Sequence, residues 1–222
     1  MARRSRRRWS GCSILSDRAA PSHVAVIDFG KTNVKVAVVD LAAGREVDER
    51  RIPNEVRRDG PYPHYDTERH WLFLLDALAS LGADWPVGAL AITTHGATAA
   101  LVAADGALAL PILDYEHPLP TGDYDAIRPD FALTGSPRLG AGLNLGAQLH
   151  WLFARFPAET ARAAHILTYP EYWAMRLSGV AAAEVTSLGC HTDLWEPFAG
   201  GLSPLADTMG WRPLIPPIRR AG

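Results

Sequence analysis

Apolar and polar residues alternate in short blocks along the first quarter of the chain, and this pattern predicts β-strands. Residues 23–29 form a compact valine-rich run, residues 33–41 form a second, and only Gly-Lys-Thr lies between them. Two such runs joined by so few residues are typical of a β-hairpin. The turn signal at residues 42–44 predicts that residues 45–53 return as a third antiparallel strand. We therefore expect the chain to open with an antiparallel meander.

Residues 54–65 are rich in proline and predict a loop, and the residues after them have the apolar spacing of a helix. Thr67 is placed to cap a helix whose apolar residues recur every three or four positions, and Gly82 is placed to end it. Residues 89–94 predict a buried strand. An alternating segment and residues 108–113 after it predict a second cluster of strands.

The second half of the chain is predicted to be mainly helical, with one short strand. Helices are expected at 143–156, 157–164 and 171–177, the last closed by Gly179, and a strand is expected at 165–168. Residues 193–222 are rich in Pro, Gly and Trp and predict a terminal loop. Together these elements predict an α/β fold with a mixed sheet that opens in an antiparallel meander and is flanked by helices.

Composition narrows the class of protein. Hydrophobic residues make up 48% of the chain and charged residues 21%, as in ordinary globular proteins. No apolar run approaches the roughly 18 residues that a membrane-spanning helix requires, so no membrane partner is expected. Cys12 and Cys190 are too few for a disulfide framework, which favours a cytoplasmic location.

The first 21 residues differ from the rest in charge. Residues 1–21 contain six arginines and one aspartate, whereas the remainder carries about seven net negative charges. No sustained apolar segment follows the arginines, so we expect a disordered basic tail and not an export signal. The acidic remainder, residues 22–222, is predicted to be the folded domain. It lacks the broad basic surface that nucleic-acid binding requires.

The octet D-F-G-K-T-N-V-K at residues 28–35 carries the most informative chemistry. A carboxylate lies at the end of the first strand. The tight turn after it offers backbone N–H groups and a hydroxyl, which can bind phosphate oxygens and a hydrated Mg²⁺. Lys31 and Lys35 are the only lysines in the sequence, which favours a compact ammonium here. The P-loop and G-x-G-x-x-G patterns are absent. An ordinary hairpin with polar turn residues is the alternative interpretation.

The pattern strand, D-x-G-x-T-x-x-K, strand resembles the opening of the FGGY carbohydrate kinases, which have the actin-like, ribonuclease-H-like ATPase fold. I-T-T-H-G-A-T-A-A-L-V-A-A-D-G at 92–106 is similar to that family's sugar-contact loop and flanking strands, most of all in the rhamnulokinase and fuculokinase branch. Three further segments follow in family order: L-P-I-L-D-Y-E-H at 110–117, H-I-L-T-Y-P-E-Y-W-A-M-R-L-S-G at 165–179 and E-V-T-S-L-G-C-H-T-D-L-W at 184–195. The resemblance covers nearly all of the chain from residue 23 onward. Glu116 and His117 stand where many members have Arg, and Lys31 replaces Thr or Ala.

The resemblance implies a kinase that phosphorylates a ketose or deoxy-ketose with ATP and Mg²⁺. It assigns Asp28 to Mg²⁺, through water. It assigns to the β- and γ-phosphates the turn residues Gly30, Lys31, Thr32 and Asn33, together with Lys35, although strand alternation can aim Lys35 elsewhere. It assigns to the sugar the residues His95, Gly96, Asp114, Tyr115 and Glu116. A hydrogen-bonded histidine at a strand end and a solvated turn are the alternative interpretations of these sugar contacts.

Members of this family are about twice as long, because two similar domains close around nucleotide and sugar. The resemblance implies that the catalytic aspartate and the adenine pocket lie beyond residue 222. We therefore expect this chain to be an N-terminal lobe that lacks its C-terminal kinase domain and has no turnover alone. A non-catalytic sugar- or phosphate-binding module and another actin-like ATPase are the competing functions, and a homodimer is left open.

One further cluster has metal-ligand chemistry. Cys190, His191 and Asp193 are close in sequence, yet no second Cys or His pair lies at ligand spacing. A metal site there is disfavoured.

Overall fold

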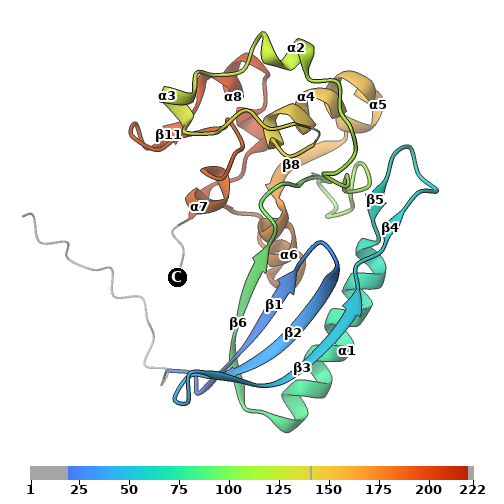
Figure 1. Ribbon diagram of the computed structural model, residues 1–222, viewed down its shortest axis with the longest axis vertical. Helices are drawn as coiled ribbons and strands as arrows, with labels where there is room; N and C mark the ends of the chain where they lie inside the picture. The colour runs from blue at the N-terminus through green and yellow to red at the C-terminus, as the bar shows by residue number, and fades with distance from the viewer. Residues whose placement is uncertain (1–19, 141, 220–222) are drawn as a thin grey trace, which may run out of the picture.

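The computed structural model describes residues 20–140 and 142–219. The predicted basic tail, residues 1–21, lies outside the described residues except for Ala20 and Pro21. The first half of the chain is built on a four-stranded mixed sheet (Figure 1). Its strands, in the order β3-β2-β1-β6, are β3 (Arg45–Pro53), β2 (Asn33–Asp40), β1 (His23–Phe29) and β6 (Val87–Thr94). β2 is antiparallel to both β1 and β3, as the sequence predicts, whereas β6 is parallel to β1.

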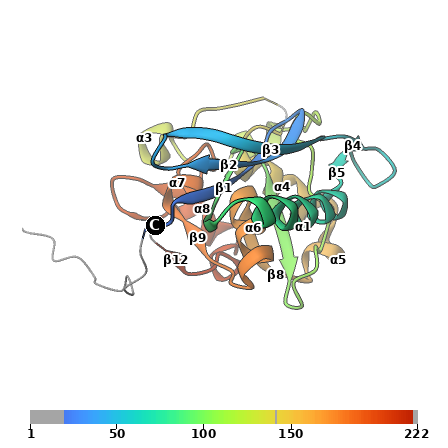
Figure 2. The same cartoon turned by 90° about the horizontal axis from the view of Figure 1, so that it is seen from below.

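Two helices, α1 (Thr67–Asp84) and α6 (Tyr169–Ser178), cover the same face of this sheet (Figure 2). Alternation along the strands turns every second side chain toward them. Phe29 of β1 stacks on Trp173 of α6, with ring centroids 4.2 Å apart. Leu74 of α1 is completely buried in the same core. The opening strands and these helices are thus held together by one apolar layer.

The ends of α1 differ from the sequence prediction. Asp66, not Thr67, is the N-cap, because its carboxylate accepts a backbone N–H of the first turn. Gly82 does not end the helix, which continues to Asp84 and is capped by Trp85 in extended conformation. A glycine ends a helix where it adopts the left-handed conformation, and Gly82 does not adopt it.

The second half of the chain surrounds a separate core, drawn above the sheet in Figure 1. The ribbon of β7 (Ala99–Ala103) and β8 (Ala163–Thr168) is antiparallel and packs against α4 (Leu145–Arg155). Shorter elements complete the chain: β4 (Val56–Arg57), β5 (His64–Tyr65), α2 (Gly122–Asp125), α3 (Phe131–Thr134), α5 (Pro157–Thr160), β9 (Ala183–Glu184), α7 (Val185–Leu188), β10 (Trp195–Glu196), β11 (Gly201–Leu202), α8 (Pro204–Thr208), the 3-10 helix η1 (Arg212–Leu214) and β12 (Ile218–Arg219).

Two sequence predictions about this half are wrong. Residues 108–113 form no strand, because only isolated bridges join Leu108 to Val102 and Leu113 to His64. The segment after residue 193, predicted as loop, contains short helices and is anchored by the completely buried Trp211. Apolar packing against the second core orders a segment whose local composition resembles a loop.

The predicted α/β class and the mixed sheet that opens in an antiparallel meander are confirmed. Gly179, with φ of 75°, closes α6 as predicted. Within residues 20–140 and 142–219, no helix combines the length and the apolar composition needed to cross a membrane.

His70 of α1 is a titratable group inside the sheet–helix core. It is completely buried beside Phe29 and Trp173, and within the described chain neither ring nitrogen has a hydrogen-bond partner. Burial lowers the pKa of His70 to about 4. The ring is therefore neutral in the folded protein at neutral pH, whereas the unfolded chain takes up a proton near pH ~6.5.

We expect acid to destabilise the protein through His70. The pKa of His70 is lower in the folded protein than in the unfolded chain, so the neutral ring contributes its full stabilisation of the fold above about pH 6.5. As the pH falls from there toward the folded pKa, the free energy of unfolding decreases by about 1.4 kcal/mol per pH unit. Urea denaturation at pH 7 and pH 4.5 measures this loss. His70→Leu should make the free energy of unfolding less dependent on pH by about 2 kcal/mol over this range. An unchanged pH dependence in that variant would contradict the assignment.

Candidate functional site

The turn between β1 and β2 is tightly closed. The N–H of Gly30 donates to the carbonyl of Asn33 at 3.0 Å, and the side chains of Thr32 and Asn33 are exposed beside each other, with Nδ2 to Oγ1 at 3.0 Å. This leaves a polar, accessible turn at the end of a rigid hairpin. Polar groups of this kind are those that the phosphate assignment calls for.

Asn54, which the sequence analysis missed, holds this turn from the other side. Its backbone N–H donates to the carbonyl of Thr32 at 2.9 Å, and its Nδ2 donates to the carbonyl of Gly30 at 2.7 Å. Asn54 is buried. Its position directly after the third predicted strand gave no local sign of this role, because the contact depends on how β3 lies along β2.

Lys31 projects from the turn into a cluster of acidic and aromatic side chains. Its Nζ lies 2.5 Å from Asp114 Oδ1 and 3.0 Å from Glu116 Oε2. It also lies 4.9 Å from the centre of the Tyr115 ring, within cation–π range. Partial burial opposes the charge, but hydrogen bonds and attraction to the two carboxylates outweigh it and raise the pKa of Lys31. The turn and the 114–116 segment are therefore joined directly.

Asp114 is the centre of this cluster. It is 5% exposed, and its Oδ1 accepts hydrogen bonds from the Tyr65 hydroxyl at 3.3 Å and from the Glu116 N–H at 3.2 Å, in addition to Lys31. Burial and the neighbouring Asp114 charge raise the pKa of Tyr65. Tyr65 is thus kept protonated as a donor.

His95 directly follows β6 and lies next to Tyr115, with ring centroids 4.8 Å apart. The backbone N–H of His95 donates to the carbonyl of Phe29 at 3.2 Å, which places His95 beside the β1–β2 turn. Nδ1 lies 3.4 Å from Thr98 Oγ1, and Nε2 is buried without a partner among the described residues. Burial, and secondarily the Lys31 charge, lower the pKa of His95 to about 4. The free nitrogen of a neutral imidazole can donate a hydrogen bond to a hydroxyl or accept one from it, depending on the tautomer.

Gly96 is closely packed against the 190–191 segment, so a larger residue at position 96 would need the Cys190 side chain to move. A Cβ at this position would lie 2.8 Å from Cys190 Sγ, closer than real Cβ contacts, and 3.5 Å from the His191 ring. The 190–191 segment therefore lies against the predicted sugar-contact loop, although nearly a hundred residues separate them in sequence.

Asp28 and Lys35 lie apart from the Lys31 cluster. They face each other across β1 and β2, on the face of the sheet opposite Phe29. Lys35 Nζ pairs with Glu46 at 3.0 Å and with Glu49 at 3.6 Å, so it is directed to β3. Its predicted phosphate contact remains a prediction, and this pairing disfavours it.

Asp28 fits the donor chemistry of a Mg²⁺ ligand. It is half-buried near the end of β1, and its carboxylate forms no hydrogen bond or ion pair with any described residue, so both carboxylate oxygens are free for an ion. Mg²⁺ is commonly bound through one or two carboxylates together with phosphates and waters. In the described part of the chain no group of three His, Cys, Asp or Glu residues could hold a metal ion.

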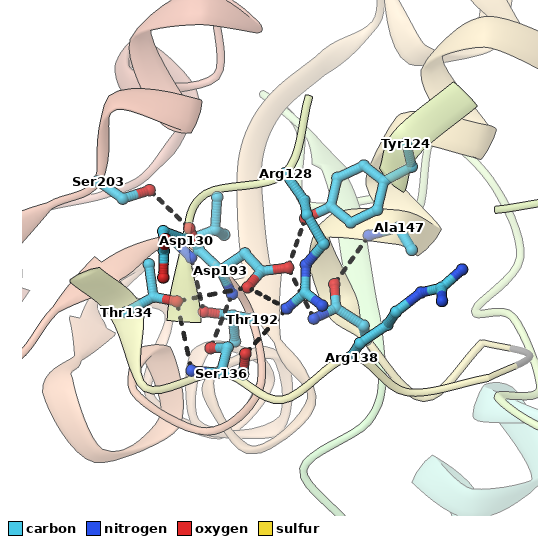
Figure 3. Close-up of polar contacts among 12 residues, drawn as sticks. Tyr124, Arg128, Asp130, Thr134, Ser136, Arg138, Ala147, Thr192, Asp193 and Ser203 are labelled. Atoms are coloured by element: carbon cyan, nitrogen blue, oxygen red, sulfur yellow. Dashed lines mark hydrogen bonds and ion pairs between the residues drawn. The ribbon is translucent and has the colours of Figure 1, made fainter. Parts of the chain in front are cut away.

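Asp193 is the centre of a buried polar network (Figure 3). It is completely buried and accepts hydrogen bonds from the Tyr124 hydroxyl at 2.7 Å, from Arg128 Nη2 at 2.9 Å and from Asn144 Nδ2 at 2.8 Å. Burial and the Asp193 charge raise the pKa of Tyr124. The carboxylate is thus committed to protein donors, while Cys190 Sγ contacts His191 Nδ1 at 3.2 Å. The three residues do not converge as a metal site.

The structure therefore brings together Lys31, His95, Asp114, Tyr115 and Glu116, with Gly96 beside them, from segments that the sequence analysis treated separately. It does not bond Asp28 or Lys35 to that cluster. Asn54 and Tyr65 are additions that the sequence did not indicate. The 190–193 loop belongs to the family-like segment 184–195, and the structure places it beside Gly96.

The chain is similar to solved sugar kinases. No protein-family model matches it, and no curated protein matches it. A carbohydrate kinase from Novosphingobium aromaticivorans is 42% identical, with a TM-score of 0.83, over 91% of this chain and 43% of that one. Xylulose kinase from Rhodospirillum rubrum is 20% identical, with a TM-score of 0.74, over 89% of this chain and 43% of that one. Glycerol kinase from Plasmodium falciparum, solved with ADP, is 14% identical, with a TM-score of 0.73 and the same coverage.

This chain thus spans less than half the length of the solved kinases that it matches. The match covers about nine-tenths of this chain. The chain has the fold of the N-terminal domain of sugar kinases with the actin-like ATPase fold.

Proposed function

We propose that this chain is the phosphate- and sugar-binding lobe of an FGGY-family kinase that phosphorylates a ketose or deoxy-ketose with ATP. The observation that carries the proposal is the bond from Lys31, in the predicted phosphate turn, to Asp114, in the predicted sugar segment. A phosphoryl-transfer site must hold the terminal phosphate and the acceptor hydroxyl next to each other. The 42% identity to a carbohydrate kinase supports the same conclusion.

Each residue group has a defined part in this function. The turn of residues 30–33 would hold the β- and γ-phosphates through the amides that the Gly30–Asn33 hydrogen bond leaves free, and Asp28 would hold Mg²⁺ through water. The ion would neutralise the charge that develops on the phosphates. The sugar would be bound by His95, Asp114, Tyr115 and Glu116, with the bare backbone of Gly96 allowing close approach. The general base and the adenine pocket are assigned to a second domain outside the matched region.

The charge of the cluster supports a neutral substrate. Lys31 has two carboxylates within 3.0 Å of its ammonium, so its charge is already matched and no unpaired cation faces the sugar contacts in this cluster. A sugar acid would meet net negative charge here and would be repelled. A ketose or deoxy-ketose, in the rhamnulokinase and fuculokinase branch, fits this environment.

A chimera tests the function. This chain would replace the matched 43% of the Novosphingobium carbohydrate kinase, and ADP release would be measured with neutral ketoses, deoxy-ketoses and gluconate. We expect ATP consumption that depends on a neutral ketose in the chimera and none with this chain alone. The remainder of the relative, expressed without this chain, is the control.

Two results would count against the kinase assignment. A folded chimera that is inactive with every sugar would contradict it. If this chain nevertheless bound a sugar or a nucleotide, the non-catalytic binding module would be the better description.

A further inference from the structure

The loop at residues 189–193 lies directly against the proposed sugar contacts. Cys190 Sγ and the His191 ring occupy the space beside Gly96 where any side chain at that position would lie. The carbonyl of His191 accepts the N–H of Leu145, at the start of α4, at 3.2 Å. The loop is therefore positioned between the His95–Gly96 segment and α4.

The backbone of this loop is strained. His191 has φ of 38° and Asp193 has φ of 61°, and within residues 20–140 and 142–219 these two are the non-glycine residues with positive φ. This region is unfavourable for residues with a Cβ. Such strain persists where the surrounding structure enforces it, and it is concentrated at binding and catalytic sites.

The Asp193 network enforces this conformation. Four side chains donate to the Asp193 carboxylate, from α2, the segment after it, α3 and the N-cap of α4, so they fix the loop to four separate parts of the chain (Figure 3). The Ser203 hydroxyl also donates to the carbonyl of Asp193 at 2.5 Å. These bonds hold the backbone of the loop in the position in which Cys190 and His191 lie against Gly96.

The chemistry of His191 suits a sugar hydroxyl. The ring is half-buried, and its polar neighbour among the described residues is the Cys190 thiol, 3.2 Å from Nδ1 and 4.0 Å from Nε2. Burial lowers the pKa of His191, so the ring is neutral at pH 7. A neutral imidazole offers one donor and one acceptor nitrogen, as a hydroxyl requires.

We propose that Cys190 and His191 form a second wall of the sugar site, on the other side of Gly96 from His95, and that His191 selects the sugar by a hydrogen bond to one of its hydroxyls. Asp193 is a positioning residue that holds this wall in place. The proposal rests on the proposed function, since it needs the His95–Gly96 segment to contact sugar.

His191→Gly removes the imidazole ring without adding backbone strain, so it tests the ring alone. Glycine adopts positive φ without cost, so the variant should unfold at the parent temperature or above it. Removing the ring should raise the Kd of the preferred sugar about 3- to 10-fold, the cost of one neutral hydrogen bond. Binding to the 222-residue chain would be measured by titration calorimetry with ketopentoses, ketohexoses and 6-deoxyketohexoses. His165→Ala, a half-buried histidine at the other end of the β7–β8 ribbon, is the matched control and should leave the Kd unchanged.

Thiol labelling provides an independent readout. A saturating sugar should slow alkylation of Cys190, measured by mass spectrometry, at least about 3-fold if the sugar covers this wall. Free glutathione added to the same sample is the reference for the reagent, and its rate of alkylation should not change.

The outcomes distinguish the two proposals. If no sugar binds the parent, or if His95→Ala binds as well as the parent, the proposed function fails and this inference fails with it. If sugar binding depends on His95 but His191→Gly keeps the parent affinity and preference, and Cys190 is not protected, only the second wall is refuted.

Discussion

Replacing Asp28 by alanine in the active chimera should lower kcat/KM by about 10²- to 10³-fold, the usual loss when a group that stabilises transition-state charge is removed. Asp28 lies near the end of β1, and its carboxylate forms no hydrogen bond or ion pair with another described residue, so the fold should be unaffected. Initial rates of ADP release at varied Mg²⁺, together with thermal unfolding, measure both parts of this prediction.

Asp76→Ala is the matched control for this substitution. Asp76 is an exposed carboxylate on α1, on the helix-covered side of the sheet, and its removal should change neither rate nor stability. Turnover at the parental rate in Asp28→Ala, at every Mg²⁺ concentration, would refute the Mg²⁺ assignment.

Replacing Asp193 by alanine should lower the free energy of unfolding by about 3 to 5 kcal/mol, the range for breaking a buried ion pair. The substitution leaves the donors of Tyr124, Arg128 and Asn144 without their shared acceptor in a buried site. It also leaves alanine at φ of 61°, where alanine is unfavourable. Urea denaturation followed by tryptophan fluorescence measures the loss.

Two further variants separate the causes of that loss. Asp193→Asn keeps the side-chain shape and tolerates positive φ, so it should lose less stability than alanine while losing the charge opposite Arg128. Asp207→Ala removes an aspartate whose pair with Arg212 is exposed, and its effect should be much smaller. Equal losses in Asp193→Ala and Asp207→Ala would show that the buried network does not stabilise the fold.

The opening of the fold could be predicted because its signals are local. β1 and β2 are short valine-rich strands with Gly-Lys-Thr between them. This pattern predicts a hairpin from adjacent residues alone, without reference to distant parts of the chain. Gly179 ends α6 for a similar reason, since a single glycine supplies the left-handed backbone that closes a helix. After residue 193, in contrast, the structure is set by tertiary contacts such as the burial of Trp211, so the loop predicted from local composition was wrong.

The sequence by itself determined the class of fold, the polar turn at residues 30–33 and the residue types available for phosphate and sugar contacts. Only the tertiary structure decided which of these residues meet. Lys31 reaches Asp114 across 83 residues of sequence, Asn54 reaches the turn across 24, and the 190–193 loop reaches Gly96 through a buried network. The physical reason is that propensity and hydrophobic period act over a few residues. The approach of distant side chains, in contrast, depends on how whole elements pack and on which buried polar groups must find partners.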